Sequence, residues 1–232
     1  MIKAILLDIE GTTTPIDFVQ NTLFPFAKAR IAGFVQEHFD SLKFELGQLA
    51  VEHASDPDYS NGFRPESPNS VADYLKYMID QDRKSTPLKS IQGMIWEKGY
   101  ESGGLTSDVF PDVPLALKRW KDSSKSIAVY SSGSVLAQRL IFKHSNQGDL
   151  TQSIDKYFDT NMGQKEDADS YRKIAADLAL EANEILFLSD TPDELNAAQT
   201  AGMQTILSSR PGNAAITESH SHKVTHSFDE ID

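Results

Sequence analysis

Two acidic side chains, Asp8 and Glu10, follow a short apolar run, and Gly11 and Thr12 come directly after them. Apolar runs of this length are typical of a strand buried in a parallel sheet. Open α/β sheets bind ligands at the carboxyl ends of their strands, so both acids would lie where chemistry occurs. Two like charges at the edge of a dry sheet repel each other, and a divalent cation relieves that repulsion. The pattern therefore predicts metal-dependent catalysis.

Further polar side chains follow later apolar runs. Ser131 and Ser132 come after Ile-Ala-Val-Tyr, Lys165 lies in the loop beyond Phe158, and Asp190 ends the run Leu-Phe-Leu-Ser-Asp. In one parallel sheet, these positions and Asp8 meet at a single edge.

These residue types suit phosphoryl transfer. A carboxylate can attack phosphorus, and a second acid can protonate the leaving oxygen and then deprotonate water. Hydroxyl, backbone N–H and lysine donors can hold the phosphate oxygens. Two like charges about 4 Å apart cost about 4 kcal/mol at an effective dielectric constant of about 20, so Lys165 alone does not offset Asp8, Asp190 and a phosphate. Mg²⁺ bridging both carboxylates and the phosphate would do so.

The elements that position these residues alternate between apolar runs and helical patterns. We expect strands at 2–7, 126–130, 184–188 and 203–207, and helices at 113–121, 135–142, 170–180 and 193–201. Such alternation predicts an α/β fold with a parallel sheet and helices on both faces.

The long interval between the first two expected strands has a different character. It shows helical periodicity on both sides of a loop at 55–70 that is rich in Pro, Ser, Asp and Asn. We therefore expect residues 1–17 and 106–232 to form the α/β core, and residues 18–105 to form an inserted helical subdomain.

The polar segment after Asn213 is expected to be peripheral. It contains His220, His222 and His226, which we interpret as exposed side chains and not as a zinc site.

The composition restricts the partners. The 232 residues include 39% hydrophobic and 24% charged residues, typical of a globular protein. A net charge of −12 repels nucleic acid and anionic membranes, so neither partner is expected. The lack of cysteine excludes disulfides, thiolate nucleophiles and cysteine-bound metals. No run approaches the roughly 18 apolar residues of a membrane span, and no signal peptide is evident. We expect a cytoplasmic monomer that acts on a small phosphorylated substrate.

The order of the polar groups resembles that of the haloacid-dehalogenase-like hydrolases. That family has a strand-end Asp-x-Asp-Gly-Thr, a hydrophobic strand ending in Ser or Thr, an isolated Lys and a final acidic cluster. The counterparts here are Asp8-Ile-Glu-Gly-Thr12, Ser131, Lys165, and Asp190 with Glu194. One departure is Glu10, whose extra methylene relative to Asp moves the proton-transfer group.

With Glu10 at this position, the sequence resembles the enolase-phosphatase branch of that family, which acts in methionine salvage. The likeness begins at Asp8-Ile-Glu-Gly-Thr-Thr-Thr-Pro-Ile16 and continues at 82–96, 130–135, 170–175 and 210–214. It covers nearly the whole chain and is weakest over 36–70 and after Ala215.

The resemblance implies a Rossmann-like core with a helical cap, Mg²⁺ and a bifunctional reaction. The substrate would be 2,3-diketo-5-methylthiopentyl-1-phosphate, which is enolised and then dephosphorylated to the acireductone 1,2-dihydroxy-3-keto-5-methylthiopentene. Asp8 would be the nucleophile and a metal ligand. Glu10 would be the general acid and base, and its backbone carbonyl would bind the metal.

The remaining roles complete the predicted site. Lys165 would neutralise the phosphoryl group, Ser131 and Ser132 would bind the substrate's oxygens, and Asp190 would bind the metal. Two interpretations stay open for Asp193 and Glu194. They would either orient Asp190 or the waters of the metal, or serve as first-turn acids that the helix dipole favours. The basic side chains of the insertion, Arg83, Lys84 and Lys89, are expected to form a solvated face. The alternative is that one of them assists proton abstraction in enolisation or closes over the phosphate.

Other functions remain open. A haloacid-dehalogenase-like phosphatase of another small phosphate monoester would use the same residues without the enolase step. A silent binding protein with this fold need not keep the whole acid–Ser–Lys–acid set.

Overall fold

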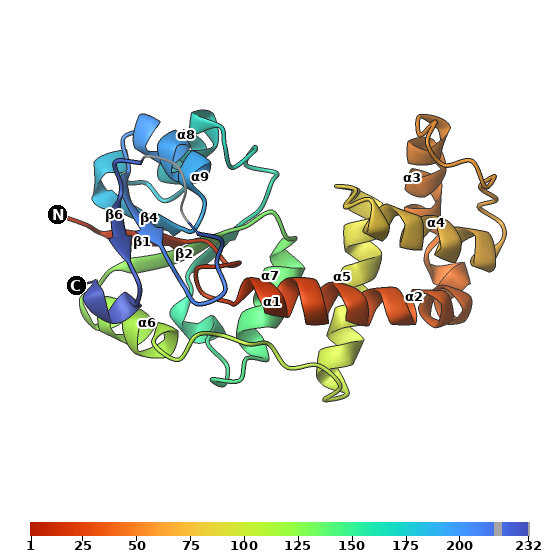
Figure 1. The fold of residues 1–232 in the computed structure, drawn as a ribbon, viewed down its shortest axis with the longest axis horizontal. Coiled ribbons are helices and arrows are strands. Elements are labelled where there is room, and N and C mark those ends of the chain that lie inside the picture. The colour runs from red at the N-terminus through yellow and green to blue at the C-terminus, as the bar shows by residue number, and fades with distance from the viewer. Residues whose placement is uncertain (216–219, 232) are drawn as a thin grey trace. The chain divides into compact units, whose positions relative to one another are not determined.

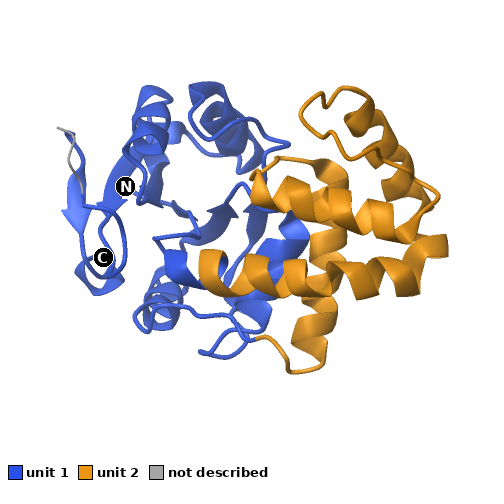
Figure 2. Cartoon of the chain, turned by 45° about the vertical axis from the view of Figure 1, so that its right-hand side comes forward, with its two compact units in different colours: residues 1–19, 106–232 blue, residues 20–105 orange. Residues whose placement is uncertain are grey.

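The computed structural model of the chain describes residues 1–215 and 220–231. The chain forms two compact units, which Figure 2 shows in different colours. Met1–Val19 and Thr106–Asp232 make up the first, which we call the α/β unit, and Gln20–Leu105 makes up the second, the helical unit. The assignment of catalysis to the first and of a cap to the second stays a prediction.

In the described part of the chain, one six-stranded parallel sheet forms the centre of the α/β unit, in the order β3-β2-β1-β4-β5-β6 (Figure 1). The strands are β1 (Ala4–Leu7), β2 (Ser126–Tyr130), β3 (Lys156–Phe158), β4 (Ile185–Ser189), β5 (Gln204–Ser208) and β6 (Lys223–Thr225). Strand β1 is wholly buried between β2 and β4, as its continuous apolar sequence predicts. The expected α/β fold with a parallel sheet is therefore confirmed.

Helices cover both faces of this sheet, with α8 and α9 on one face and α6 and α7 on the other (Figure 1). They are α6 (Val113–Asp122), α7 (Val135–Lys143), α8 (Ala168–Asp177) and α9 (Pro192–Thr200), and a short α1 (Ile16–Phe18) follows the first strand. Side-chain caps explain where α7 and α8 begin, because Ser134 accepts a hydrogen bond from the N–H of Ala137 and Asp167 accepts one from Asp169.

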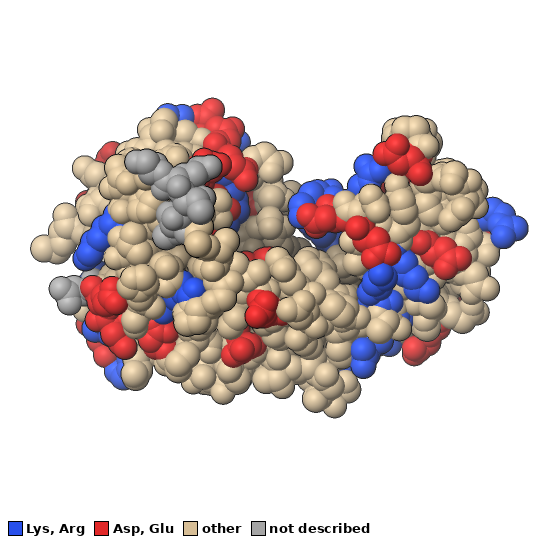
Figure 3. Space-filling view, in the orientation of Figure 1, with Lys and Arg blue, Asp and Glu red and all other residues tan. Residues whose placement is uncertain are grey.

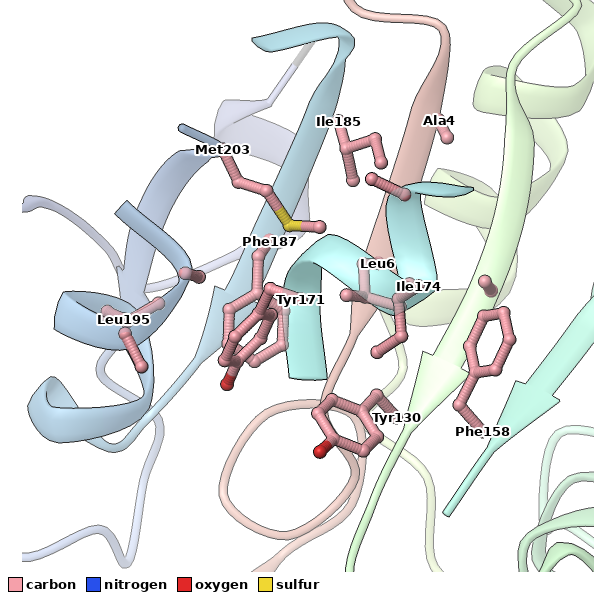
Figure 4. Close-up of a cluster of buried hydrophobic side chains, with 14 of the residues drawn as sticks. Ala4, Leu6, Tyr130, Phe158, Tyr171, Ile174, Ile185, Phe187, Leu195 and Met203 are labelled. Atoms are coloured by element: carbon pink, nitrogen blue, oxygen red, sulfur yellow. The ribbon is translucent and has the colours of Figure 1, made fainter. Parts of the chain in front are cut away.

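A cluster of buried side chains joins α8 and α9 to the sheet (Figure 4). The ring of Tyr171 lies 5.2 Å from that of Phe187 and 5.6 Å from that of Tyr130, measured between centroids. Leu6 and Leu195 are fully buried in the same cluster. Removal of this apolar surface from water stabilises the sheet, whose carboxyl edge carries the polar residues that follow the strands.

The helical unit contains α2 (Phe24–His38), α3 (Lys43–Ala54), α4 (Pro68–Asp80) and α5 (Thr86–Glu101). Ser67 and Ser85 cap α4 and α5 through their side chains. The expected loop at 55–70 therefore ends earlier, at Ser67. Trp96 is buried and donates its indole N–H to the carbonyl of Leu23 at 2.8 Å, which ties α5 to the start of α2. No helix in the described ranges has the length and apolar character needed to cross a membrane.

The expectation of a peripheral polar tail after Asn213 is wrong. The C-terminal segment supplies strand β6 and a 3₁₀ turn in which Phe228 is fully buried. The expected exposure is also wrong for His222, which is buried and contacts the Thr205 hydroxyl at 2.8 Å and the Asn196 carboxamide at 3.0 Å. A three-residue strand at the sheet edge buries few apolar side chains, so its sequence has little hydrophobic pattern.

Arg210, in the loop after β5, links this segment to the rest of the unit. Its guanidinium packs against the rings of Phe110 and Phe228, at 4.9 and 4.3 Å from their centroids. It donates to Asp112 Oδ2 at 2.6 Å and to the Thr12 carbonyl at 3.1 Å. Asp112 also accepts the backbone N–H of Phe228 at 2.6 Å. This buried ion pair therefore connects the chain's last turn to the turn after β1.

We expect Asp112→Asn to lower the free energy of unfolding by about 3 kcal/mol near neutral pH, because the buried Arg210 would lose its counter-charge. Burial raises the pKa of Asp112, but hydrogen bonds from Phe228 and Arg210 outweigh it and hold that pKa below its ordinary value. The carboxylate thus stabilises the fold above its unfolded pKa of about 4, and this contribution is lost as pH falls further. Urea unfolding of both proteins across this range measures the effect.

A matched control is Asp122→Asn, because Asp122 forms an exposed pair with Lys118 on the same helix. Its loss should lower the free energy of unfolding by less than about 1 kcal/mol. Equal losses for the two variants would contradict a structural role for the buried pair.

Candidate active site

The polar groups meet at the carboxyl edge of the sheet because their strands are neighbours. Asp8 follows β1, Ser131 follows β2 and Asp190 follows β4, and Leu7 is paired with both Val129 and Leu188. The N–H of Asp8 donates to the carbonyl of Leu188 at 2.9 Å, so the ladder extends to the acid itself.

Lys165 lies at the centre of this edge. Its Nζ is 2.6 Å from Asp8 Oδ1 and 2.6 Å from Glu194 Oε2, and all three side chains are at most 10% exposed. Burial lowers the pKa of Lys165, but the charges of Asp8 and Glu194 outweigh it and raise that pKa above its ordinary value. Lys165 is therefore a fixed cation between two acids.

Glu194 lies in the first turn of α9, and its carboxylate faces Lys165. Its carboxylate also accepts the hydroxyl of Ser189 at 2.8 Å. Burial, followed by the charge of Asp8, raises the pKa of Glu194 above its ordinary value. Of the two interpretations left open for this residue, the structure therefore favours a place in the site. Asp193 is exposed and lies in the first turn of α9, where the helix dipole favours an acid.

Two buried tyrosines hold the loop that carries Lys165. The hydroxyl of Tyr130 donates to the Gly163 carbonyl at 2.9 Å, and that of Tyr171 donates to the Lys165 carbonyl at 2.7 Å. Gly163 has a φ of 137°, and a Cβ there would lie 2.1 Å from the hydroxyl oxygen of Ser170. The loop's path therefore requires glycine at this position. In the sequence, both tyrosines are apolar positions of a strand and a helix, which gives no sign of this role.

Asp190 lies against the turn that follows β1. A Cβ on Gly11 would be 2.1 Å from Asp190 Oδ2, and Gly11 has a φ of 69°, so only glycine fits there. Burial, followed by the charge of Asp8, raises the pKa of Asp190 to about 6. Its hydrogen-bond donor is the hydroxyl of Thr191, at 3.1 Å.

Glu10 belongs to the same turn and is half-buried. Hydrogen bonds close the turn, from the N–H of Gly11 to the Thr14 carbonyl at 2.8 Å and from the Thr13 hydroxyl to the Asp8 carbonyl at 3.2 Å. The backbone around Glu10 is thereby fixed beside Asp8.

The two predicted serines differ in exposure. Ser131 is buried, and its hydroxyl oxygen accepts the N–H of Gly133 at 3.2 Å. Ser132 is exposed. The carboxamide of Gln138, a residue the sequence analysis missed, donates to the carbonyls of Gly133 and Phe158 and fixes this loop.

The basic residues of the helical unit pair locally. Arg83 contacts Asp56 and Asp58, each at 3.1 Å, and Lys84 contacts Asp82 at 3.0 Å. Acidic and basic side chains are interspersed on the face that Figure 3 shows. These pairs agree with the expected solvated face.

The donor set at the sheet edge fits a magnesium ion. The edge carries three carboxylates but a single ammonium, that of Lys165; the carboxylates belong to Asp8, Asp190 and Glu194. Within the described residues, no group of three or more His, Cys, Asp or Glu side chains is arranged to hold a metal. Mg²⁺ does not need one, because it takes one or two carboxylates and fills its shell with water and phosphate oxygens.

Comparison with known proteins defines the class. The family model of haloacid dehalogenase-like hydrolases matches residues 2–202, and the chain belongs to this family. It is 46% identical over 224 residues to a Drosophila mojavensis protein named enolase-phosphatase E1, covering 94% of this chain and 89% of that one. It is 47% identical to the Synechococcus elongatus protein of the same name, covering 99% and 98%. The UTR4 protein of Saccharomyces cerevisiae has a solved structure with a TM-score of 0.84 at 34% identity, with full coverage of both chains. The expected family is thereby confirmed.

In protein kept free of divalent cations, Asp190→Asn should raise the free energy of unfolding by about 2 kcal/mol at about pH 8. The raised pKa means that folding disfavours the ionised carboxylate. This penalty is full above the folded pKa, diminishes as pH falls, and is absent below the unfolded pKa of about 4. Urea unfolding in chelator at several pH values measures it.

The control is Asp193→Asn, which removes an exposed acid of the same segment, three residues after Asp190. It should slightly lower the free energy of unfolding, because the negative charge of Asp193 interacts favourably with the dipole at the start of α9. A loss of stability in Asp190→Asn at pH 8 would show that Asp190 is not under charge repulsion.

Proposed function

We propose that this protein is a Mg²⁺-dependent enolase-phosphatase of methionine salvage. It converts 2,3-diketo-5-methylthiopentyl-1-phosphate to the acireductone 1,2-dihydroxy-3-keto-5-methylthiopentene and phosphate. The observation that carries the proposal is the buried contact of Lys165 with Asp8 and Glu194, beside Asp190, at the edge of the sheet. The relatives named enolase-phosphatase E1, which are 46% and 47% identical to this chain, support the combination of an enolase and a phosphatase step.

Asp8 acts as the nucleophile. Its Oδ1 accepts a hydrogen bond from the ammonium of Lys165, which orients the carboxylate that attacks phosphorus. The Asp8–phosphorus bond forms as the bond from phosphorus to the enol oxygen breaks. The Lys165 charge also offsets that of the phosphoryl group, because the ammonium is fixed before substrate binds.

Glu10 moves the protons of the phosphatase step. It protonates the leaving enol oxygen, and then takes a proton from the water that attacks the phosphorus of the acyl phosphate on Asp8. Phosphate is released and Asp8 is restored. Ser131 and Ser132 orient the oxygens of the substrate by hydrogen bonds.

The carboxylates of Asp8 and Asp190, with the backbone carbonyl of Glu10, would hold the cation. A bound Mg²⁺ would supply Lewis-acid stabilisation of the negative charge that develops on the substrate's oxygens. The protein holds these oxygens at one edge because β1 and β4 are neighbours in the sheet.

The proposal extends to a monomeric, cytoplasmic enzyme whose partner is a small phosphorylated molecule. The net charge of −12, which opposes binding to polyanions, supports a small substrate.

An anaerobic assay of the diketo phosphate tests the function, with enediol absorbance and free phosphate followed together. The wild-type protein should produce both, and chelator should suppress both. Asp8→Asn should lower phosphate release at least about 10³-fold while its circular dichroism stays unchanged, because no nucleophile remains. Phosphate without enediol, together with rapid hydrolysis of other esters, would support a phosphatase for a different monoester and overturn the proposal.

Substitution Glu10→Asp tests the departure from the family pattern. The shorter side chain withdraws the carboxyl from the leaving oxygen, so phosphate release should slow by about 10²-fold. Glu166→Asp is the control, since Glu166 is exposed and adjoins Lys165, and its rate should not change. Equal rates for Glu10→Asp and the wild type in both half-reactions would remove any need for the longer acid.

A further inference from the structure

Asn213, in the loop after β5, uses only one half of its carboxamide in contacts with the protein. Its Nδ2 donates to the Gly11 carbonyl at 2.9 Å and to the Ser208 carbonyl at 3.2 Å. Because both partners are acceptors, the NH₂ group must face them, which fixes the orientation of the carboxamide. Oδ1 is then buried and accepts no hydrogen bond from any described residue.

The position of Gly11 shows which neighbours surround this oxygen. A Cβ built on Gly11 would be 3.1 Å from Asn213 Oδ1 and 2.1 Å from Asp190 Oδ2. A carboxylate oxygen and a carboxamide oxygen therefore lie against the same side of Gly11. A buried acceptor without a donor costs about 1–3 kcal/mol, so this arrangement needs a compensating ligand.

A hydrated cation supplies what both oxygens lack. A carboxylate binds Mg²⁺ directly, and a carboxamide oxygen accepts a hydrogen bond from water in the cation's shell. Ser131, which follows the neighbouring strand β2, and Lys165, which already contacts two acids, have other partners. The chemistry of the space beside Gly11 thus differs from that of the phosphate-binding side.

We infer that Asn213 is a positioning residue for the cation, with Oδ1 accepting a hydrogen bond from a water of the ion that Asp190 holds. Through Nδ2, the same side chain fixes Gly11 and with it the turn that carries Glu10. The inference rests on the proposed function, because it requires the cation at Asp190. It adds a contact from a loop that carries none of the predicted catalytic groups.

Binding of Mn²⁺, counted from the electron paramagnetic resonance signal of the free ion, tests this without turnover. Asn213→Ala should weaken Mn²⁺ binding by about tenfold, the effect typical of removing an outer-shell partner. Asp190→Asn should weaken it further and identifies the ion counted as the one at this site. Asn183→Ala is the matched control, because Asn183 is exposed at the opposite end of β4, and its affinity should equal that of the wild type.

Asn213→Asp separates the cation contact from a purely structural role. It keeps an oxygen at this place but removes the NH₂ donor of the Gly11 and Ser208 carbonyls. We expect lower thermal stability without the ion, together with Mn²⁺ affinity at least equal to that of the wild type. Ala214→Asp adds the same charge at the adjacent, exposed position. Introduced into the Asn213→Ala protein, it should not restore the Mn²⁺ affinity that Asn213→Asp shows.

The outcomes are distinguishable. Wild-type Mn²⁺ affinity in Asn213→Ala, with a folded protein by circular dichroism, would overturn the inference and leave the proposed function intact. Equal loss of affinity in Asn213→Ala and Asn213→Asp would assign Asn213 to the turn alone, which also overturns it. Absence of Mn²⁺ binding by the wild-type protein would instead overturn the cation site of the proposed function.

Discussion

The ammonium of Lys165, fixed between Asp8 and Glu194, is the interaction on which the site depends. Three carboxylates within one edge of a sheet would otherwise repel one another strongly. One ammonium offsets only part of this charge, and burial together with the charge of Asp8 raises the pKa of Asp190. In the proposed function, this excess of negative charge would attract the divalent cation, without a complete cage of protein ligands.

Elements far from the reacting atoms maintain this arrangement. Tyr130 and Tyr171 extend from the buried cluster of Figure 4 and hold the Lys165 loop through their hydroxyls. On the other side of β1, Arg210 and Asn213 hold the turn that follows Asp8. The core thus does more than stabilise the fold, because its polar ends set the positions of the charges. A change in the packing of Tyr171 would shift the backbone of Lys165, because the Tyr171 hydroxyl is hydrogen-bonded to the Lys165 carbonyl.

Much of this could be predicted from the sequence, for physical reasons. A continuous apolar run in a parallel sheet is unmistakable, which explains why β2 begins and ends at the expected residues. Parallel strands share an edge, so the common location of Asp8 and Asp190 follows from the order of elements. Strands β3 and β6 were not predicted, because each has three residues at an edge of the sheet and buries little. The contact of Glu194 was left open, since acids at a helix start usually serve the dipole.

The most direct test of the central claim is reductive trapping of the acyl phosphate during turnover. Protein quenched while it processes the diketo phosphate and treated with borohydride should contain homoserine at position 8, because hydride reduces the activated carboxyl of an aspartyl phosphate. Peptide mass spectrometry reads this change, and protein without substrate should keep aspartate there. Free phosphate released at the normal rate, with Asp8 unmodified under the same quench, would contradict the account.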